Sequence, residues 1–213
     1  MFQKQSDFNM KYSQNLEDQI IGNYFKGLPG NFLSIGENDG ITLSNTYALT
    51  LAGWHGVCVE ASPSAFEKLT ATHKGNSYIQ LIHAAATDYN GEIVLHESGS
   101  HLGVGDVALL SSTIKSETVK WVKDTFTEVT VPAVNFATLL GLSKIKNFDF
   151  ISIDCEGCEI CMLKQMDLKA LGCKLLCVEY NSKDQYLYDN IVVPQGYRLI
   201  HKNGENLIYE QSI

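Results

Sequence analysis

Hydrophobic residues recur along the chain at two spacings, one typical of helices and one typical of buried strands. Residues 16–25 carry apolar side chains at helical spacing and end before Gly27 and Pro29, so we expect an N-terminal helix. Short apolar or alternating runs predict strands over residues 31–35, 56–60, 77–83, 128–134, 148–153 and 174–179. Helical patterns lie at residues 44–51, 63–73, 116–126, 135–142 and 158–166. This alternation predicts an α/β three-layer sandwich around a mainly parallel sheet.

Three further segments depart from the alternation. Tyr89-Asn90-Gly91 is typical of a hairpin turn and leads into a predicted strand over residues 92–96. Residues 98–112 contain three glycines and few periodic apolar positions, which predicts a long loop of the kind that covers binding sites. The last segment, residues 197–209, predicts an antiparallel hairpin whose two strands flank Asn203-Gly204.

Length and composition place the chain among ordinary globular domains. Its 213 residues are 45% hydrophobic and 19% charged, which suffices to bury one substantial core. No Pro/Gly-rich linker divides the chain, so we expect a single domain over residues 1–213, with an N-terminal cap helix in residues 1–30 and the core in residues 31–213. Six scattered cysteines, an N-terminus without an apolar signal segment and no apolar run near 18 residues predict a cytoplasmic protein without a membrane span.

The charge balance narrows the range of partners. Acidic residues outnumber basic ones by 24 to 16, the formal net charge is −8, and Arg198 is the only arginine. Clustered Lys and Arg hold nucleic-acid backbones, and bidentate phosphate recognition favours Arg. The composition therefore argues against a nucleic-acid partner.

Acidic side chains follow each of the predicted parallel strands. Ligands in parallel α/β sheets bind outside these carboxyl ends. Each acid taken alone has a structural explanation, because strand-end acids also cap helices and organise turns. Together they predict a nucleoside site, in which a glycine turn lets the backbone approach the ligand and an acid accepts the ribose hydroxyls. The acids are Glu37, Asp39, Glu60, Asp88, Asp154, Glu156 and Glu179.

The first strand-end turn, Gly36-Glu37-Asn38-Asp39-Gly40, narrows the choice of nucleoside. A dinucleotide pyrophosphate requires G-x-G-x-x-G, whereas this turn reads G-x-x-x-G and adds two carboxylates that repel phosphate. S-adenosylmethionine combines a ribose with a sulfonium and an ammonium group, and a negative site suits these cations. S-adenosylmethionine is therefore the expected cofactor. An NAD(P)-dependent oxidoreductase and a non-catalytic nucleoside-binding module are the alternatives on the same scaffold.

Five motifs in order resemble those of a known family. They are YSQNLEDQII, FLSIGENDGITLSNT, GVCVEASPSAFEKL, AAATDYNGE and FDFISIDCEGCEICML, and they span roughly residues 12 to 181. In this order they are similar to the motifs of FkbM-type S-adenosylmethionine-dependent methyltransferases. The resemblance implies a Rossmann-like class I methyltransferase fold and O-methylation of hydroxyls on sugars, polyketides or related small molecules.

The resemblance also implies roles for individual residues. Gly36, Glu37, Asn38, Asp39 and Gly40 would line the methionine part of the cofactor. Glu60, in the segment Glu60-Ala61-Ser62, would bind the ribose, and Asp88 the adenine amino group. Gln14, in the YSQ segment, would close over the cofactor, while Asp154 and Glu156 would face the transferring methyl group. Glu37 stands where the family more often has a small residue, in GAND rather than GEND.

Methyl transfer to a hydroxyl requires alignment of the two reactants and removal of a proton. Asp154, at the end of the central strand, is the first candidate for the base or the orienting group, although it could instead only fix the following turn. Glu156 is the second candidate. His101, in the predicted loop, is the third because the histidine pKa suits a general base. Arg198 lies far along the chain in the closing hairpin, so a neutral polyol or sugar hydroxyl is the expected acceptor.

Two metal-site alternatives arise from the same region. Cys155, Cys158 and Cys161 share the opening spacing of a ferredoxin cluster, but Gln165 stands where the fourth ligand belongs, so we interpret these cysteines as small hydrophobic residues. A divalent ion bound by Asp154, Glu156, Glu179 and a histidine is the second alternative, since vicinal hydroxyls chelate oxygen-ligated metals. The favoured interpretation assigns no metal.

Overall fold

A computed structural model describes residues 11–99, 108–118 and 125–212. The helices are α1 (Glu17–Phe25), α2 (Tyr47–Leu51), α3 (Pro63–Thr72), α4 (Lys115–Thr118), α5 (Phe136–Leu142), α6 (Glu159–Leu163), α7 (Tyr186–Val192) and the 3₁₀ helix η1 (Val193–Gln195). The strands are β1 (Asn31–Ile35), β2 (His55–Glu60), β3 (Ile79–His83), β4 (Ala85–Ala86), β5 (Gly91–Ser98), β6 (Phe126–Val134), β7 (Phe150–Ile153), β8 (Leu175–Glu179), β9 (Tyr197–Lys202) and β10 (Asn206–Gln211).

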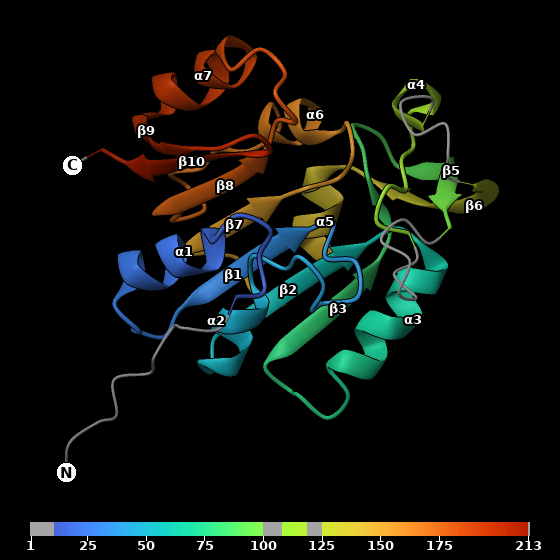
Figure 1. Cartoon of the computed structure of the whole chain (residues 1–213), viewed down its shortest axis with the longest axis horizontal. Coiled ribbons are helices and arrows are strands. Elements are labelled where there is room, and N and C mark those ends of the chain that lie inside the picture. Colours follow the sequence, from blue (N-terminus) through green and yellow to red (C-terminus); the bar gives the residue numbers. More distant parts are fainter. Residues whose placement is uncertain (1–10, 100–107, 119–124, 213) are drawn as a thin grey trace.

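The main sheet confirms the predicted architecture. Its seven strands run in the order β3-β2-β1-β7-β8-β10-β9. The first five are parallel, and β10 pairs antiparallel with both β8 and β9, so the C-terminal hairpin closes one edge (Figure 1). The carboxyl ends of β1, β2, β7 and β8 therefore lie at one edge of the sheet, where ligands of parallel sheets bind.

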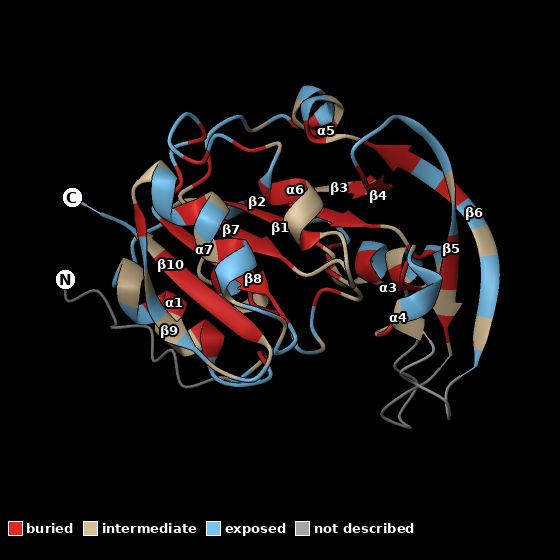
Figure 2. Cartoon of the chain, turned by 90° about the horizontal axis from the view of Figure 1, so that it is seen from above, coloured by how far each residue is buried: buried red, intermediate tan, exposed pale blue. Residues whose placement is uncertain are grey.

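Helices cover both faces of this sheet and form the outer layers of the sandwich. Along β1, Phe32 packs in one hydrophobic cluster with residues of α1, α2 and α3, while Leu33 packs in another with residues of α5, α6 and α7. Successive strand residues point to opposite faces, so both faces of β1 are buried and its sequence is mainly apolar, with Asn31 and Ser34 as the polar exceptions. Figure 2 shows the buried main sheet inside a more exposed outer layer.

The segment predicted to cap the fold belongs to one of these layers. Ile21 of α1 is fully buried in the cluster that contains Phe32 and Trp54. Residues just before α1 also contact the first strand-end loop, because Ser13 forms a β-bridge with Leu43. Within the described residues, no helix is both long enough and apolar enough to cross a membrane.

A second sheet corrects the hairpin prediction at Tyr89-Asn90-Gly91. Its strand order is β4-β6-β5, with β4 parallel and β5 antiparallel to β6. The turn therefore joins two strands that both pair with β6 and not with each other. Asn90 helps to hold this arrangement, since its side-chain oxygen accepts a hydrogen bond from the backbone N–H of Asn135, just beyond β6.

Two helix predictions also need correction. The helix expected over residues 116–126 does not reach Phe126, because Phe126 begins β6 and pairs with Ser98; residues 119–124 lie outside the described part of the chain. Helix α7 was not predicted. It has seven residues, and its buried Tyr188 and Val192 are a single i, i+4 pair, which is too short a pattern to show periodicity.

Candidate active site at the carboxyl ends of the parallel strands

A cavity of about 280 Å³ opens at the carboxyl ends of β1, β2, β7 and β8. Its volume is near the lower end of the range of small-molecule sites, roughly 300–1,000 Å³. Eight of the residues predicted for the site line it: Gln14, Gly36, Glu37, Asn38, Glu60, Ala61, Asp154 and Glu156. Glu179, the acid at the end of β8, lines it as well. The topology thus brings together residues more than 160 positions apart in the sequence.

The loop after β1 approaches β7 very closely. Gly36 has a φ of +83°, and a Cβ atom built on it would lie 1.5 Å from the carbonyl oxygen of Asp154. Only glycine permits this conformation together with this approach. The contact fixes the distance between the cavity-lining backbone at Gly36 and the side chain of Asp154.

Glu37, the unusual residue of this loop, is held by hydroxyl groups. Its carboxylate accepts hydrogen bonds from Ser44 Oγ at 2.7 Å and from Thr46 Oγ1 at 2.8 and 2.9 Å. Burial raises the pKa of Glu37, while these hydrogen bonds act in the opposite direction. Glu37 therefore ties the loop that follows β1 to the start of α2 at the cavity wall.

Asp39 and Gly40 lie behind the cavity lining. Asp39 accepts hydrogen bonds from the backbone N–H groups of Ile41 and Thr42, at 2.8 and 2.7 Å, which is a turn-forming pattern. Gly40 has a φ of +80° and packs beside Leu69 of α3. Both residues shape the loop rather than border the cavity.

Glu60 ends β2 and links two loops. Its carboxylate accepts hydrogen bonds from the backbone N–H of Asn38 at 2.8 Å and from that of Ser62 at 2.7 Å. Burial raises the pKa of Glu60 to about 7, despite the opposing effect of these bonds. The second strand thus delivers a carboxyl group to the cavity in a fixed orientation.

The free energy of unfolding of the ligand-free protein is expected to fall as the pH rises from about 5 to 8, partly through Glu60. The pKa of Glu60 is about 7 in the folded protein, against an ordinary value of 4.5. The contribution of Glu60 to stability is therefore complete at pH values below its ordinary pKa and is lost as the pH rises through its pKa in the folded protein. The loss is about 3 kcal/mol at most. Urea unfolding at several pH values measures the fall.

Glu60→Gln should show a shallower pH dependence than the wild type, because the amide does not titrate. It should also lose some stability at every pH, since a side-chain amide offers one acceptor oxygen to two N–H donors. The exposed Glu67→Gln variant is the matched control and should keep the wild-type dependence. If Glu60→Gln and the wild type showed the same pH dependence, the raised pKa of Glu60 would not be a source of that dependence.

Three other predicted residues lie elsewhere. Ser62 caps α3 by accepting the N–H of Ala65 at 3.1 Å and does not line the cavity. Asp88 is exposed in the turn after β4 and is also outside the lining. His101 falls outside the described residues.

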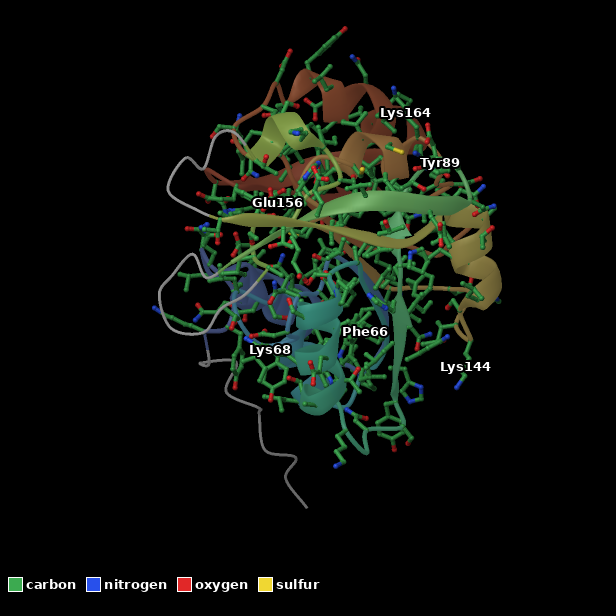
Figure 3. All side chains as sticks on the ribbon, turned by 90° about the vertical axis from the view of Figure 1, so that its right-hand side faces the viewer. Phe66, Lys68, Tyr89, Lys144, Glu156 and Lys164 are labelled. Atoms are coloured by element: carbon green, nitrogen blue, oxygen red, sulfur yellow. The ribbon has the colours of Figure 1, made fainter. Side chains whose placement is uncertain are left out.

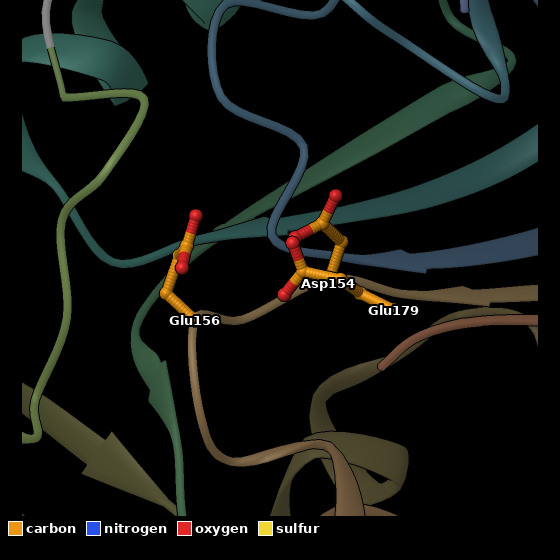
Figure 4. A group of neighbouring side chains, drawn as sticks. All are labelled: Asp154, Glu156 and Glu179. Carbon is orange, nitrogen blue, oxygen red and sulfur yellow. The ribbon is translucent and has the colours of Figure 1, made fainter. Parts of the chain in front are cut away.

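Three carboxyl groups meet at the ends of β7 and β8, and we call Asp154, Glu156 and Glu179 the acid cluster. One oxygen of each lies within 4.8 Å of the others (Figure 4). Two ionised carboxylates at that distance repel each other by about 3 kcal/mol at an effective dielectric of 20. Burial and the neighbouring acids raise the pKa of all three residues, so the ligand-free cluster retains protons near neutral pH.

Glu159 organises the loop that carries two of these acids, and sequence reasoning missed it. Its buried carboxylate accepts the backbone N–H of Cys155 at 3.2 Å and that of Gly157 at 2.8 Å, and it pairs with Lys183 at 3.6 Å. Glu156 adopts a left-handed φ of +51° inside this loop. The available signal was an acid in the first turn of a predicted helix, a position that favours negative charge.

Apolar residues line the other end of the cavity and were also missed. Ala84, Ala85 and Ala86 border it where β3 passes into β4, together with Leu95 of β5. Their signal was the A-A-A run directly after a predicted strand. The cavity therefore has an apolar end, a central carboxyl group at Glu60 and an acidic end.

The cysteine run does not form a metal-ligand group among the described residues. All six cysteines are free thiols. Cys155 and Cys158 line the cavity, and burial raises the pKa of both thiols. Cys155 and Cys161 pack against the core cluster of the main sheet, as small hydrophobic residues do.

The fold resembles that of solved methyltransferases. The methyltransferase FkbM from Methylobacillus flagellatus KT aligns with a TM-score of 0.56 and 12% identity, over 86% of this chain and 44% of that one. A precorrin-6y C5,15-methyltransferase from Geobacter metallireducens GS-15 aligns with a TM-score of 0.50 and 9% identity, over 97% and 96% of the two chains. The chain thus has the Rossmann-like fold of class I methyltransferases.

The sequence of the chain identifies its family within this class of methyltransferases. The family model "Methyltransferase FkbM domain" matches residues 34–198, and the chain belongs to this family of methyltransferases. It spans 44% of the length of the FkbM structure from Methylobacillus flagellatus. Comparison with curated proteins gave no match. Methyltransferases of this kind generally use S-adenosylmethionine as the methyl donor.

Proposed function

We propose that the protein is an S-adenosylmethionine-dependent O-methyltransferase that acts on a hydroxyl group of a sugar, a glycoside or another small neutral molecule. The observation that carries this proposal is the acid cluster at one end of the cavity, with Glu60 between it and the apolar end. Continuous packing of both helical layers on one sheet supports a single domain for this activity.

The residues that line the cavity suit the chemical groups of S-adenosylmethionine. Glu60 would accept the ribose hydroxyls, and Ala84, Ala85 and Leu95 would contact the adenine ring. The loop from Gly36 to Asn38 and Gln14 would border the methionine part. When bound, the cofactor supplies a methyl group activated by its sulfonium.

The acid cluster is suited to deprotonate and orient an alcohol. A general base works best when its pKa lies near the operating pH, and burial moves the pKa of Asp154 and Glu156 upward in that direction. A deprotonated Asp154 or Glu156 would take the proton of the acceptor hydroxyl, whose oxygen gains the methyl group. The sulfur–methyl bond breaks, which leaves S-adenosylhomocysteine. Their position on the strand end and the adjoining loop fixes where the acceptor hydroxyl binds.

The acceptor is expected to be neutral. Arg198 pairs with Glu210 in the C-terminal hairpin and does not line the cavity. A bidentate arginine clamp for a phosphate or carboxylate is therefore lacking among the described cavity residues, and the acidic wall repels anions. Hydroxyls of polyols and sugars suit such a wall because they donate hydrogen bonds to carboxylates.

The proposal is tested by calorimetry and an acceptor screen. Titration with S-adenosylmethionine should show binding, and a panel of sugars, glycosides and other alcohols should release S-adenosylhomocysteine with at least one member. Binding of NADH without binding of S-adenosylmethionine would favour an oxidoreductase instead. Binding of S-adenosylmethionine without turnover on any acceptor would favour the non-catalytic module.

A further inference from the structure

One carboxylate of the acid cluster lacks the hydrogen-bond donors that the other buried carboxylates around the cavity have. Glu60 accepts two backbone N–H groups, Glu37 accepts two hydroxyls, and Glu159 accepts two N–H groups and pairs with Lys183. In contrast, Oε2 of Glu179 is buried and accepts a hydrogen bond from no described residue. Glu179 itself is only 7% exposed. A buried carboxylate oxygen without a donor requires a partner.

No described lysine donates a hydrogen bond to Oε2 of Glu179. Lys183 pairs with Glu159 at 3.6 Å, and its charge offsets only part of the rise in the pKa of Glu156 and Glu179. Lys144 and Lys164 are exposed at the periphery of the molecule (Figure 3). The cavity therefore presents the acid cluster to a cation from solution, which would displace the retained protons on binding.

The strands hold the cluster in a defined geometry. Ile153 of β7 pairs with Val178 of β8, so the next residues along the two parallel strands, Asp154 and Glu179, lie side by side. Glu156 is placed by the loop that Glu159 fixes through two backbone hydrogen bonds. Ligands that are already oriented lose little conformational freedom on binding.

The spacing of the oxygens matches a hard divalent cation. Ca²⁺ binds oxygens at 2.3–2.6 Å, so opposite ligands lie about 4.6–5.2 Å apart; Mg²⁺ binds at 2.0–2.1 Å, which brings them to about 4.0–4.2 Å. The three carboxylate oxygens lie within 4.8 Å of one another. The spacing is therefore close to that of a Ca²⁺ site, and Mg²⁺ would require the oxygens to move closer together.

We propose that the acid cluster binds one hard divalent cation through one oxygen each of Asp154, Glu156 and Glu179, with further coordination positions open to the cavity. This departs from the sequence-based expectation of no metal. It also departs from the alternative that included a histidine, since no histidine belongs to the cluster among the described residues. An all-oxygen ligand set selects Ca²⁺, Mg²⁺ or Mn²⁺ over Zn²⁺.

The open positions define an acceptor class, a step that rests on the proposed function. Hard cations take six or more oxygens, so three protein ligands leave room for two from the acceptor. Two adjacent hydroxyls, as in a vicinal diol of a sugar, would bind as a chelate. Each acid supplies one ligand oxygen, which leaves its second oxygen to receive the proton of the bound hydroxyl.

Direct binding to the free protein tests the site without any methyl transfer. Calorimetric titration with CaCl₂, MgCl₂ and MnCl₂, and the electron paramagnetic resonance signal of Mn²⁺, should show one ion per chain. Losing a residue that merely supports a metal ligand costs about 10–100-fold in affinity, so Glu179→Gln should weaken binding at least as much. The exposed Glu92→Gln on β5 is the matched control and should bind like wild type.

Thermal unfolding separates loss of the site from loss of the fold. Wild type and Glu92→Gln should gain thermal stability when the ion is added, whereas Glu179→Gln should melt cooperatively and gain none. The site is refuted if wild type binds none of the three ions at millimolar concentration, or if Glu179→Gln binds as tightly as wild type. If either result is obtained while S-adenosylmethionine still binds, the metal site is refuted and the proposed function is not. If the metal binds but S-adenosylmethionine does not, only the proposed function is refuted.

Discussion

Asp154→Asn is expected to lower kcat by about 10²–10⁴-fold, the usual contribution of a positioned proton-transfer group. Asparagine keeps the shape of the side chain but cannot accept the proton of the acceptor hydroxyl. Glu60 and the apolar end of the cavity are unchanged, so the affinity for S-adenosylmethionine should stay close to that of wild type. Steady-state release of S-adenosylhomocysteine measures the first quantity, and calorimetry measures the second.

The control for this variant is Asp167→Asn, which changes an exposed aspartate outside the cavity lining. It should retain both wild-type turnover and wild-type cofactor affinity. Unchanged turnover in Asp154→Asn would remove Asp154 from the chemistry and leave it the role of fixing the turn after β7. A parallel loss of cofactor affinity and turnover would assign it to cofactor binding instead.

The strands were predictable because burial on both faces leaves a simple signature. The run at residues 31–35 coincides with β1, and residues 174–179 exceed β8 by one residue. Both are interior strands of the main sheet and are mainly apolar; the polar exceptions are Asn31 and Ser34 in β1 and Glu179 at the end of β8. The location of Glu60 and Asp154 followed from the strands, since a residue at a parallel strand's carboxyl end lies at the binding edge of the sheet.

Side-chain direction could not be predicted in the same way. Asp39 and Asp88 follow strands as Glu60 does, yet Asp39 turns back on its own loop and Asp88 points to solvent. The turn containing Asp88 belongs to the second sheet, whose pairing depends on β6, some 40 residues further along the chain. Strand-end position fixes the edge of the sheet, and only the path of the loop fixes which side chains face the cavity.

Glu37 shows how a departure from the family pattern is accommodated locally. The motif resemblance implies a small residue here, and a glutamate would otherwise bury a carboxylate without partners. Ser44 and Thr46, seven and nine residues further on, donate hydrogen bonds to it. The sequence contains the acid and both hydroxyl residues, the latter in the S-N-T segment. Their hydrogen bonds could not be predicted, because the path of the loop between them is not evident from the sequence.

Gly36→Ala is expected to destabilise the protein by about 2–5 kcal/mol. A left-handed φ costs an alanine about 1–2 kcal/mol, and overpacking of a tight contact typically costs another 1–3 kcal/mol. The new Cβ would lie 1.5 Å from the carbonyl oxygen of Asp154 and 2.6 Å from its carbonyl carbon, so backbone must move. Urea unfolding measures the loss, and calorimetry with S-adenosylmethionine should show weaker binding in the folded fraction because the two cavity walls separate.

Gly53→Ala isolates the conformational part of this cost. Gly53 has a φ of +82°, nearly that of Gly36, but no heavy atom lies within 4 Å of the position its Cβ would take. Its variant should therefore lose only about 1–2 kcal/mol and keep wild-type cofactor affinity. If Gly36→Ala lost no more stability than Gly53→Ala, the ends of β1 and β7 would be free to separate. The close approach of Gly36 to Asp154 would then not be what positions the acid cluster against the cofactor side of the cavity.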